Sequence, residues 1–128
     1  MNFLELAIVG PKLIDPDNGF AIATPDRLRG ALGAYQKPKV VLGLRPEALR
    51  PVPRNMDSRD APLLSIDVLQ HLGHETLLDA SSGPHRIVAR VSASDDSRIG
   101  EKRPFLFDPE HMHLFDSETG ANLSLGSG

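Results

Sequence analysis

The sequence predicts a mainly β fold, a small barrel of short strands accompanied by one or two short helices. Three observations lead to this class. Apolar and polar residues alternate over several short runs, a pattern typical of half-buried strands. The 128 residues include 11 prolines and 11 glycines, which favour frequent turns over long helices. Few windows have the spacing of an amphipathic helix.

The first part of the chain is expected to form strands followed by one helix. Residues 3–9 are an apolar run that predicts a strand. Residues 12–23 predict a hairpin around Pro16-Asp17-Asn18-Gly19, which has turn chemistry at every position. Thr24 is the expected N-cap of a helix that runs to Tyr35 and is weakened by two glycines.

The middle of the chain changes from an irregular connection to regular strands. Residues 50–62 contain prolines and no periodicity, so we expect an extended surface connection. Residues 64–72 alternate as a strand does, and this alternation places Ile66, Val68 and Leu72 together on one side and Ser65, Asp67 and His71 on the other.

The rest of the chain continues this pattern. Further strands are expected at residues 76–80, 85–91, 105–107 and 112–116, a polar loop at 92–100, and a disordered tail at 121–128. Several short strands with a helix among them are what an OB-type barrel requires, and closure of a barrel removes exposed strand edges. The fold class is therefore an OB-type small barrel or pair of barrels.

Composition limits the possible partners and compartments. The formal net charge of −3 argues against a nucleic-acid or anionic-membrane partner, which would require a basic face. The chain has no cysteine, so it contains neither disulfides nor thiolate zinc sites. No apolar run approaches the roughly 18 residues of a membrane span, and no secretory leader is recognisable. The length fits one domain.

Residues 40–49 are the most informative stretch. They begin as a continuous apolar run, typical of a strand buried on both faces. Gly43 has no Cβ and permits a bulge or a close approach by another backbone. Pro46 cannot donate to a sheet, so the strand should end in the charged corner Arg45-Pro46-Glu47. The charges of Arg45 and Glu47 are free either to pair with each other or to meet another subunit.

The search for catalytic motifs is negative. No phosphate-binding loop and no Gly-x-Ser-x-Gly nucleophile motif is present. Residues 15–19, Asp-Pro-Asp-Asn-Gly, resemble a calcium loop, but the glycine comes one place early and no glutamate follows at the required distance. A turn is the favoured interpretation. Asp95 and Asp96, like Asp57 and Asp60, lie in loops without an adjacent base and are assigned to solvated surfaces.

Histidines offer a second candidate for chemistry. His111 and His113 share one side of a strand, and His71 and His74 flank a turn. A zinc site needs three or four convergent ligands, and nothing in the spacing requires convergence. Surface histidines are therefore favoured over a metal-dependent enzyme, and we assign no catalytic, cofactor-binding or metal-binding residue.

Four segments, in order, resemble a known family. Residues 42–49 are similar to its Leu-Gly-Ile-Arg-Pro-Glu-His-Leu signature, and residues 1–4 to its opening Met-Asn-Phe/Leu-Leu. Residues 68–76 resemble Glu-x-Leu-Gly-Ser-Glu-Thr, and residues 107–120 resemble Asp-Pro-x-x-x-His-Leu-Phe-Asp-x-x-Thr-Gly. The family is the C-terminal regulatory region of the ATP-binding subunits of carbohydrate ABC importers, of the maltose and glycerol-phosphate type.

This sequence departs from the family pattern at three positions. Ala48 replaces the usual histidine, His74 replaces the usual serine, and Pro104 stands where an apolar strand residue is common. These changes affect local contacts.

The resemblance implies a transport-associated OB (TOBE) domain, made of two OB-like lobes that share strands. Residues 1–128 would form this regulatory domain, a C-terminal piece of a longer ATPase whose catalytic core is absent. ATP and Mg²⁺ would belong to that missing core, and this chain would hold no cofactor and hydrolyse no ATP. Expected partners are a second copy, the transporter's membrane subunits and a regulatory protein. The expected location is the cytoplasmic face of the cell membrane.

The resemblance also marks ten motif residues as interface or structural positions. They are Gly43, Arg45, Pro46, Glu47, Gly73, Glu75, His113, Leu114, Phe115 and Asp116. Leu114 and Phe115 are the expected apolar anchors of a dimer, unless they fill the core and the corner only shapes the chain. Gly73 is expected at a positive φ.

One further class remains open, a self-standing OB-type sensor of a small ligand or an oxyanion. Such a site needs clustered cations, and Arg86, Arg90 and Lys102 are the only candidates.

Overall fold

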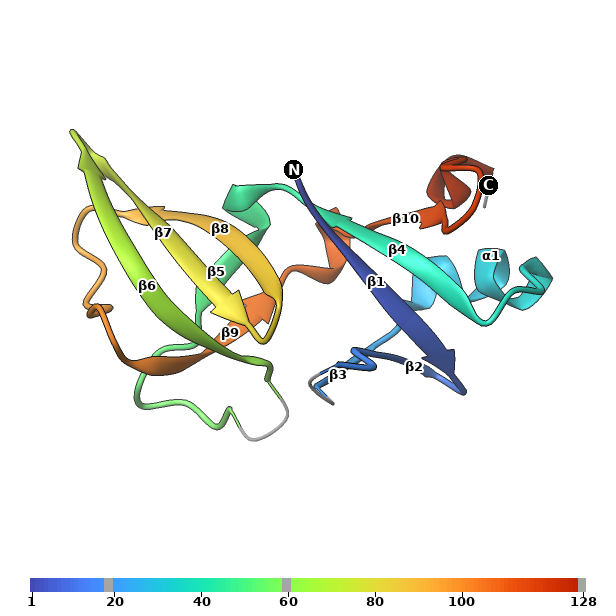
Figure 1. The fold of residues 1–128 in the computed structure, drawn as a ribbon, viewed down its shortest axis with the longest axis horizontal. Helices are drawn as coiled ribbons and strands as arrows, with labels where there is room; N and C mark the ends of the chain where they lie inside the picture. Colours follow the sequence, from blue (N-terminus) through green and yellow to red (C-terminus); the bar gives the residue numbers. More distant parts are fainter. Residues whose placement is uncertain (18–19, 59–60, 127–128) are drawn as a thin grey trace.

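The computed structural model describes residues 1–17, 20–58 and 61–126. Within these ranges the chain forms two five-stranded antiparallel sheets that lie side by side (Figure 1). This arrangement confirms the predicted mainly β, OB-type class. No helix in the described ranges is long and apolar enough to cross a membrane.

The first sheet combines the two ends of the chain. Its strand order is β10-β4-β1-β2-β3. The strands are β1 (Asn2–Val9), β2 (Lys12–Ile14), β3 (Ala21–Ala23), β4 (Lys39–Leu44) and β10 (His113–Asp116). β10 returns from the end of the chain to pair with β4, with Leu114 opposite Leu42.

The second sheet is built from one continuous part of the chain. Its strand order is β5-β9-β6-β7-β8. The strands are β5 (Leu49–Pro51), β6 (Leu63–Leu72), β7 (Glu75–Ser82), β8 (His85–Ser92) and β9 (Lys102–Phe107). Two-residue turns join β6 to β7 and β7 to β8, and they begin at Gly73 (φ 66°) and Gly83 (φ 56°). Tight hairpins favour positive φ at this place, as expected for Gly73.

The helices are short. They are η1 (Asp26–Leu28), α1 (Arg29–Ala34), η2 (Pro46–Ala48), η3 (Pro109–His111) and η4 (Leu123–Gly126). The helix predicted after Thr24 therefore starts as a 3-10 turn, and Pro25 rather than Thr24 is its N-cap, without a side-chain cap bond. The Thr24 hydroxyl is buried and caps nothing in the described structure.

A single apolar core connects the two sheets. The largest fully buried side chains come from both: Leu4, Leu6, Leu13, Leu42 and Leu44 from the first sheet, and Leu49, Leu64, Ile66, Leu78, Ile87 and Phe105 from the second. Leu28 of η1 is also fully buried. The core thus holds the two lobes as one folding unit.

The prediction that Ile66, Val68 and Leu72 share one side of β6 was wrong. Ile66 is buried, but Val68 and Leu72 are 48% and 47% exposed. The pairing register of β6 with β7 shifts between Ile66 and Val68, so the strand carries one extra residue there. Because side chains alternate, this β-bulge turns the following residues over, and Leu69 packs on the core instead.

Two predicted irregular segments contain regular structure. The predicted connection 50–62 begins inside β5, where Arg50 pairs with Leu106 of β9. In the predicted disordered tail, Asn122 bridges Phe115 and residues 123–126 form η4, because the tail lies against β10. Residues 18–19 of the predicted hairpin turn, 59–60 of the connection and 127–128 of the tail lie outside the described residues.

Candidate functional site

The charged corner after β4 carries the chain from the first sheet to the second. β4 ends at the buried Leu44, Pro46 occupies the first position of η2, and the Ala48 N–H donates to the Arg45 carbonyl at 2.9 Å. Leu49 then opens β5 in the second sheet. The strand therefore stops where Arg45 begins the corner, as predicted, because proline favours a helical start and cannot continue the ladder.

Of the two alternatives left open for Arg45 and Glu47, pairing with each other does not occur among the described residues. Glu47 instead lies 3.9 Å from Arg90 of β8, and the Arg90 Nε atom lies 3.3 Å from Glu75 of β7. Arg90 thus links the corner to the start of β7. All three side chains are about half exposed, so each pair contributes only about 0–1 kcal/mol.

Gly43 is required by a close approach of side chains. A Cβ atom built on Gly43 would lie 2.7 Å from the Cε2 atom of Phe115 and 2.9 Å from the Sδ atom of Met1. Phe115 also meets Phe3 edge-on, with ring centroids 5.8 Å apart. The close approach was predicted, but it comes from side chains rather than from another backbone.

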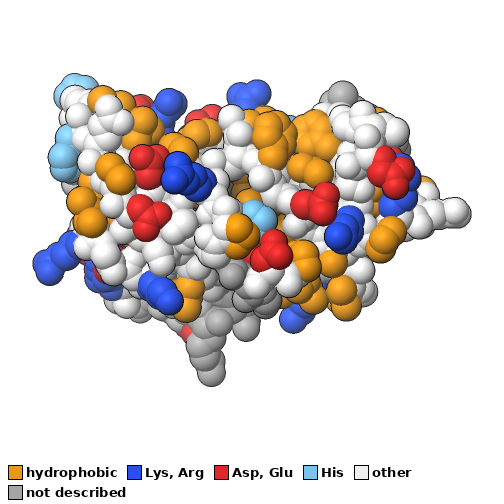
Figure 2. Space-filling model, viewed as in Figure 1, with side chains coloured by type: hydrophobic (Ala, Val, Ile, Leu, Met, Phe, Trp, Pro, Cys, Tyr) orange, Lys and Arg blue, Asp and Glu red, His pale blue; other side chains and the backbone are white. Residues whose placement is uncertain are grey.

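These side chains form an apolar surface, which we call the aromatic patch and define as Met1, Phe3 and Phe115. Met1 is 50% exposed and Phe3 is 60% exposed, although both are apolar. Figure 2 shows apolar side chains grouped over this part of β1 and β4. Contiguous exposed apolar patches, when they are large, mark interaction surfaces, so this group is the candidate interface of the chain.

The remaining motif residues of β10 divide between core and turn. Leu114 is fully buried within the chain, so it fills the core and cannot anchor a dimer. Both carboxylate oxygens of Asp116 accept hydrogen bonds from Lys37, at 2.9 and 2.8 Å. The pKa of Asp116 is lowered to about 2, chiefly by the Lys37 ammonium and secondly by the hydrogen bond from the Glu118 N–H. Asp116 thereby holds the turn that follows the last strand.

A cleft lies beside the corner, and we call it the motif cleft. Its volume is about 430 Å³, and its lining residues are Arg45, Glu47, Ala48, Asp108, His111 and His113. The His111 Nδ1 atom lies 2.9 Å from Asp108, and the Glu110 N–H donates to the same carboxylate at 3.0 Å. The pKa of Asp108 is lowered, most by the hydrogen bond from the Glu110 N–H and next by the contact with His111. Cationic and acidic side chains both line the cleft, so its charge does not favour binding of an anion.

The three candidate cations of an oxyanion site are not brought together. Arg90 is already paired with Glu47 and Glu75. Arg86 lines one surface cleft and Lys102 lines another. The structure therefore gives the oxyanion-sensor alternative no cluster of cations in the described residues. The four candidate metal-binding histidines likewise form no metal-binding group within the described ranges, and His71 contacts Thr76 at 3.0 Å.

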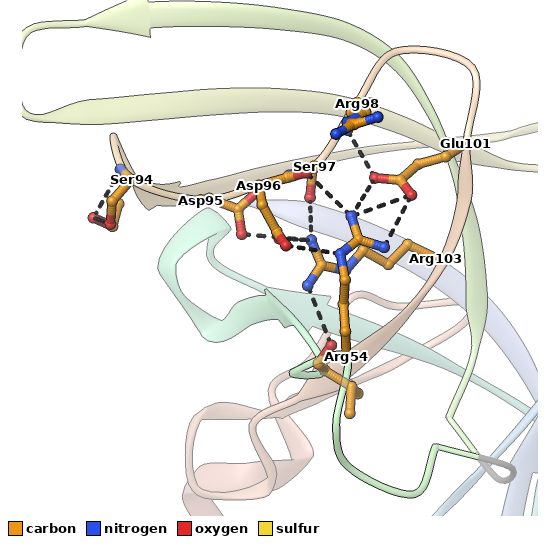
Figure 3. Close-up of polar contacts among 10 residues, drawn as sticks. Arg54, Ser94, Asp95, Asp96, Ser97, Arg98, Glu101 and Arg103 are labelled. Carbon is orange, nitrogen blue, oxygen red and sulfur yellow. Dashed lines mark hydrogen bonds and ion pairs between the residues drawn. The ribbon is translucent and has the colours of Figure 1, made fainter.

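A polar network that the sequence did not predict joins the 92–100 loop to the connection after β5 (Figure 3). Arg103 is buried, and it donates to Asp96 at 2.7 Å and to Ser97 at 2.9 Å. Arg54 bonds both Asp96, at 2.7 Å, and Glu101, at 3.0 Å. Asp96 is exposed, as assigned, but the expectation that it has no basic partner was wrong: Arg54 lies 42 positions away in the sequence and Arg103 seven.

One local signal did point to this network. Arg103 has the same strand phase as Phe105 and Phe107, so alternation alone places it inward. A buried arginine requires hydrogen-bonding partners. The pKa of Asp96 is lowered to about 2, chiefly by its hydrogen bond with Arg54 and secondly by that with Arg103.

The two-lobed β architecture, joined through an Arg-Pro-Glu corner, is that of a transport-associated OB-type domain. The chain belongs to the TOBE domain family, whose model matches residues 42–115. The match covers the corner and most of β10.

Curated relatives extend the similarity over most of the chain. The sn-glycerol-3-phosphate import ATP-binding protein UgpC of Bordetella parapertussis is 30% identical over 133 aligned residues, which cover 96% of this chain and 33% of the relative. The protein of the same name from Cupriavidus metallidurans is 29% identical and covers 86% of this chain and 29% of the relative. The putative ABC transporter ATP-binding protein YcjV of Escherichia coli K12 is 30% identical, with 93% and 32% covered. The chain thus spans about a third of the length of these relatives.

Proposed function

We propose that this chain is the regulatory and dimer-stabilising domain of the ATP-binding subunit of a carbohydrate ABC importer. Membership of the TOBE domain family and the similarity to import ATP-binding proteins support this assignment. In this proposal the domain supports ATP-driven import from the cytoplasmic face of the membrane, in complex with the membrane subunits. It performs no ATP hydrolysis, since its sequence has no phosphate-binding loop.

The observation that carries the dimer part is the aromatic patch. Phe3 meets Phe115 edge-on while Phe3 stays 60% exposed, so these apolar rings contact each other without being covered. Interface centres are enriched in aromatic residues and methionine, and a two-fold dimer places the same patch of each copy against the other. Arg45, which lies exposed one residue beyond β4, would sit at the polar rim.

Sedimentation equilibrium and chemical cross-linking of the chain test this assignment. We expect a concentration-dependent dimer whose dissociation constant rises at least tenfold in Phe3→Ser. The matched control is Leu63→Ser, which removes a similarly exposed apolar side chain from β6, in the other sheet. A chain that stays monomeric up to its solubility limit, or a dimer weakened equally by both variants, overturns the dimer part.

Equilibrium dialysis with labelled ATP tests the absence of a nucleotide site. We expect no saturable binding to this chain, because no backbone cradle for phosphates is present in the sequence. Saturable ATP binding would contradict the assignment of a purely regulatory role.

A further inference from the structure

Three side chains with atoms that can bind a metal ion meet where the two sheets adjoin, and family membership does not account for them. Asp15 follows β2 of the first sheet, and Asp17 lies two residues further on. His85 is the first residue of β8 in the second sheet. One potential ligand atom from each residue lies within 4.8 Å of the other two. Figure 2 shows histidine and acidic side chains adjoining near the middle of the displayed face.

The backbone holds this cluster from both sides. The Asp15 N–H donates to the Phe20 carbonyl at 2.9 Å, and the Asp17 N–H donates to the Oδ1 atom of Asp15 at 3.0 Å. His85 follows the tight Gly83-Pro84 turn and pairs with Ser82 across it. The aspartates and the imidazole are therefore placed by two separate hairpins, 70 residues apart in sequence.

The distances fit ligands that share one metal ion. The Nε2 atom of His85 lies 3.2 Å from Oδ1 of Asp15 and 3.5 Å from Oδ2 of Asp17. Around a tetrahedral ion with bonds of about 2.0–2.2 Å, neighbouring ligand atoms lie about 3.3–3.6 Å apart. The two separations from His85 are therefore close to those around a single ion, and the ligand atoms of Asp15 and Asp17 lie within 4.8 Å of each other.

A second observation points to a cation independently of the spacing. The Asp15 side chain is fully buried, and its Oδ2 atom has no hydrogen-bond partner among the described residues. A buried oxygen without a partner is costly, by about 1–3 kcal/mol and more for a charged group. Its other oxygen already faces His85. A cation in the cluster would satisfy this carboxylate, which can bind an ion through one oxygen or both.

We propose that Asp15, Asp17 and His85 form a binding site for a divalent transition-metal ion of the Zn²⁺ class. An imidazole nitrogen beside two carboxylates suits zinc, whereas Ca²⁺ and Mg²⁺ favour oxygen ligands alone. Asp17 is exposed and His85 is partly exposed, so the ion has a route of entry and a coordination position open to water.

This site would act as a clamp between the lobes. It joins the β2 hairpin of the first sheet to β8 of the second, at a place where no covalent connection exists. In this site the two aspartates of the calcium-like segment, Asp15 and Asp17, bind the ion, and the third ligand is His85. The inference is independent of the proposed transport role.

Isothermal titration of the metal-free chain with ZnCl₂ tests the proposal. We expect one saturable site in the wild type and at least a tenfold weaker one in Asp17→Asn and in His85→Gln. Asp17 is exposed, so its substitution keeps the test valid if variants of the buried Asp15 fail to fold. His111→Gln is the matched control, because His111 also contacts an aspartate but belongs to no three-residue group in the described ranges.

Thermal unfolding gives a second readout. Zinc should raise the unfolding midpoint of the wild type and of His111→Gln equally and that of His85→Gln clearly less, because stabilisation follows the affinity of the folded state. Absence of saturable heat in the wild type, or equal affinity in the wild type and His85→Gln, overturns the site. In either case His85 and the aspartates form only an ion pair.

Discussion

The side-chain amide of Asn2 binds both backbone groups of Val88. Its Nδ2 atom donates to the Val88 carbonyl at 2.8 Å, and its Oδ1 atom accepts from the Val88 N–H at 2.8 Å. Asn2 begins β1 in the first sheet, and Val88 lies in β8, the edge strand of the second. The amide therefore takes the place of a neighbouring strand at this edge, and it ties together residues 86 positions apart.

Substitution of Asn2 should weaken the junction between the sheets. Asn2→Ala leaves the Val88 N–H and carbonyl without these partners, and we expect the free energy of unfolding to fall by about 1–3 kcal/mol. Urea denaturation measures this change. Asn2→Asp retains only the acceptor and should also destabilise, whereas Glu5→Gln, at an exposed position of the same strand, should stay within about 0.5 kcal/mol of the wild type.

Gly43 should tolerate no side chain. In Gly43→Ala the new methyl group would overlap Phe115 and Met1, and we expect a loss of about 1–3 kcal/mol in the free energy of unfolding. Gly33→Ala is the control, because Gly33 lies in α1 with open space around it, and alanine there should be neutral or stabilising by up to about 1 kcal/mol.

A double-mutant cycle identifies the cause of the Gly43 effect. Phe115→Ala removes the ring that crosses Gly43, so the loss caused by Gly43→Ala should shrink in the Phe115→Ala background. Equal losses in both backgrounds would assign the effect to Met1 or to the backbone instead.

Acid should destabilise the protein partly through Asp96. Its folded-state pKa of about 2 lies below the ordinary value of 3.8, because Arg54 and Arg103 favour the carboxylate. A lowered folded-state pKa contributes stability above pH 4, and this contribution is lost as the pH falls from about 4 to about 2. Asp96→Asn should therefore flatten the pH dependence of stability in this window, which urea denaturation at a series of pH values measures.

Arg103 should be irreplaceable by lysine. Arg103 reaches Asp96, Ser97 and the Val52 carbonyl with two guanidinium nitrogens, a geometry that one ammonium cannot reproduce. We expect Arg103→Lys to lower the free energy of unfolding by about 1–3 kcal/mol in chemical denaturation. Lys102→Arg, an exposed neighbour in β9, should have little effect; equal stability of Arg103→Lys and the wild type would show that the network contributes nothing.

Local sequence patterns were sufficient for much of the fold. Alternation placed the strands at 85–91 and 105–107, and glycine and proline marked the turns at 73–74 and 83–84. The Arg45-Pro46-Glu47 corner was predictable because proline acts on its own backbone and needs no distant partner. The motifs in residues 42–49 and 107–120 also carried the family assignment.

Tertiary structure alone decided how these elements face and pair. The bulge in β6 exposes Val68, and no local rule marks Asp67 as an extra residue. Arg90 rather than Arg45 meets Glu47, because the corner packs near β8. The Asn2 bridge to Val88 and the Asp15 contact to His85 join positions 86 and 70 residues apart. Periodicity reports which side of an element is apolar, but partner choice between distant polar groups depends on how the sheets are placed, which only long-range packing determines.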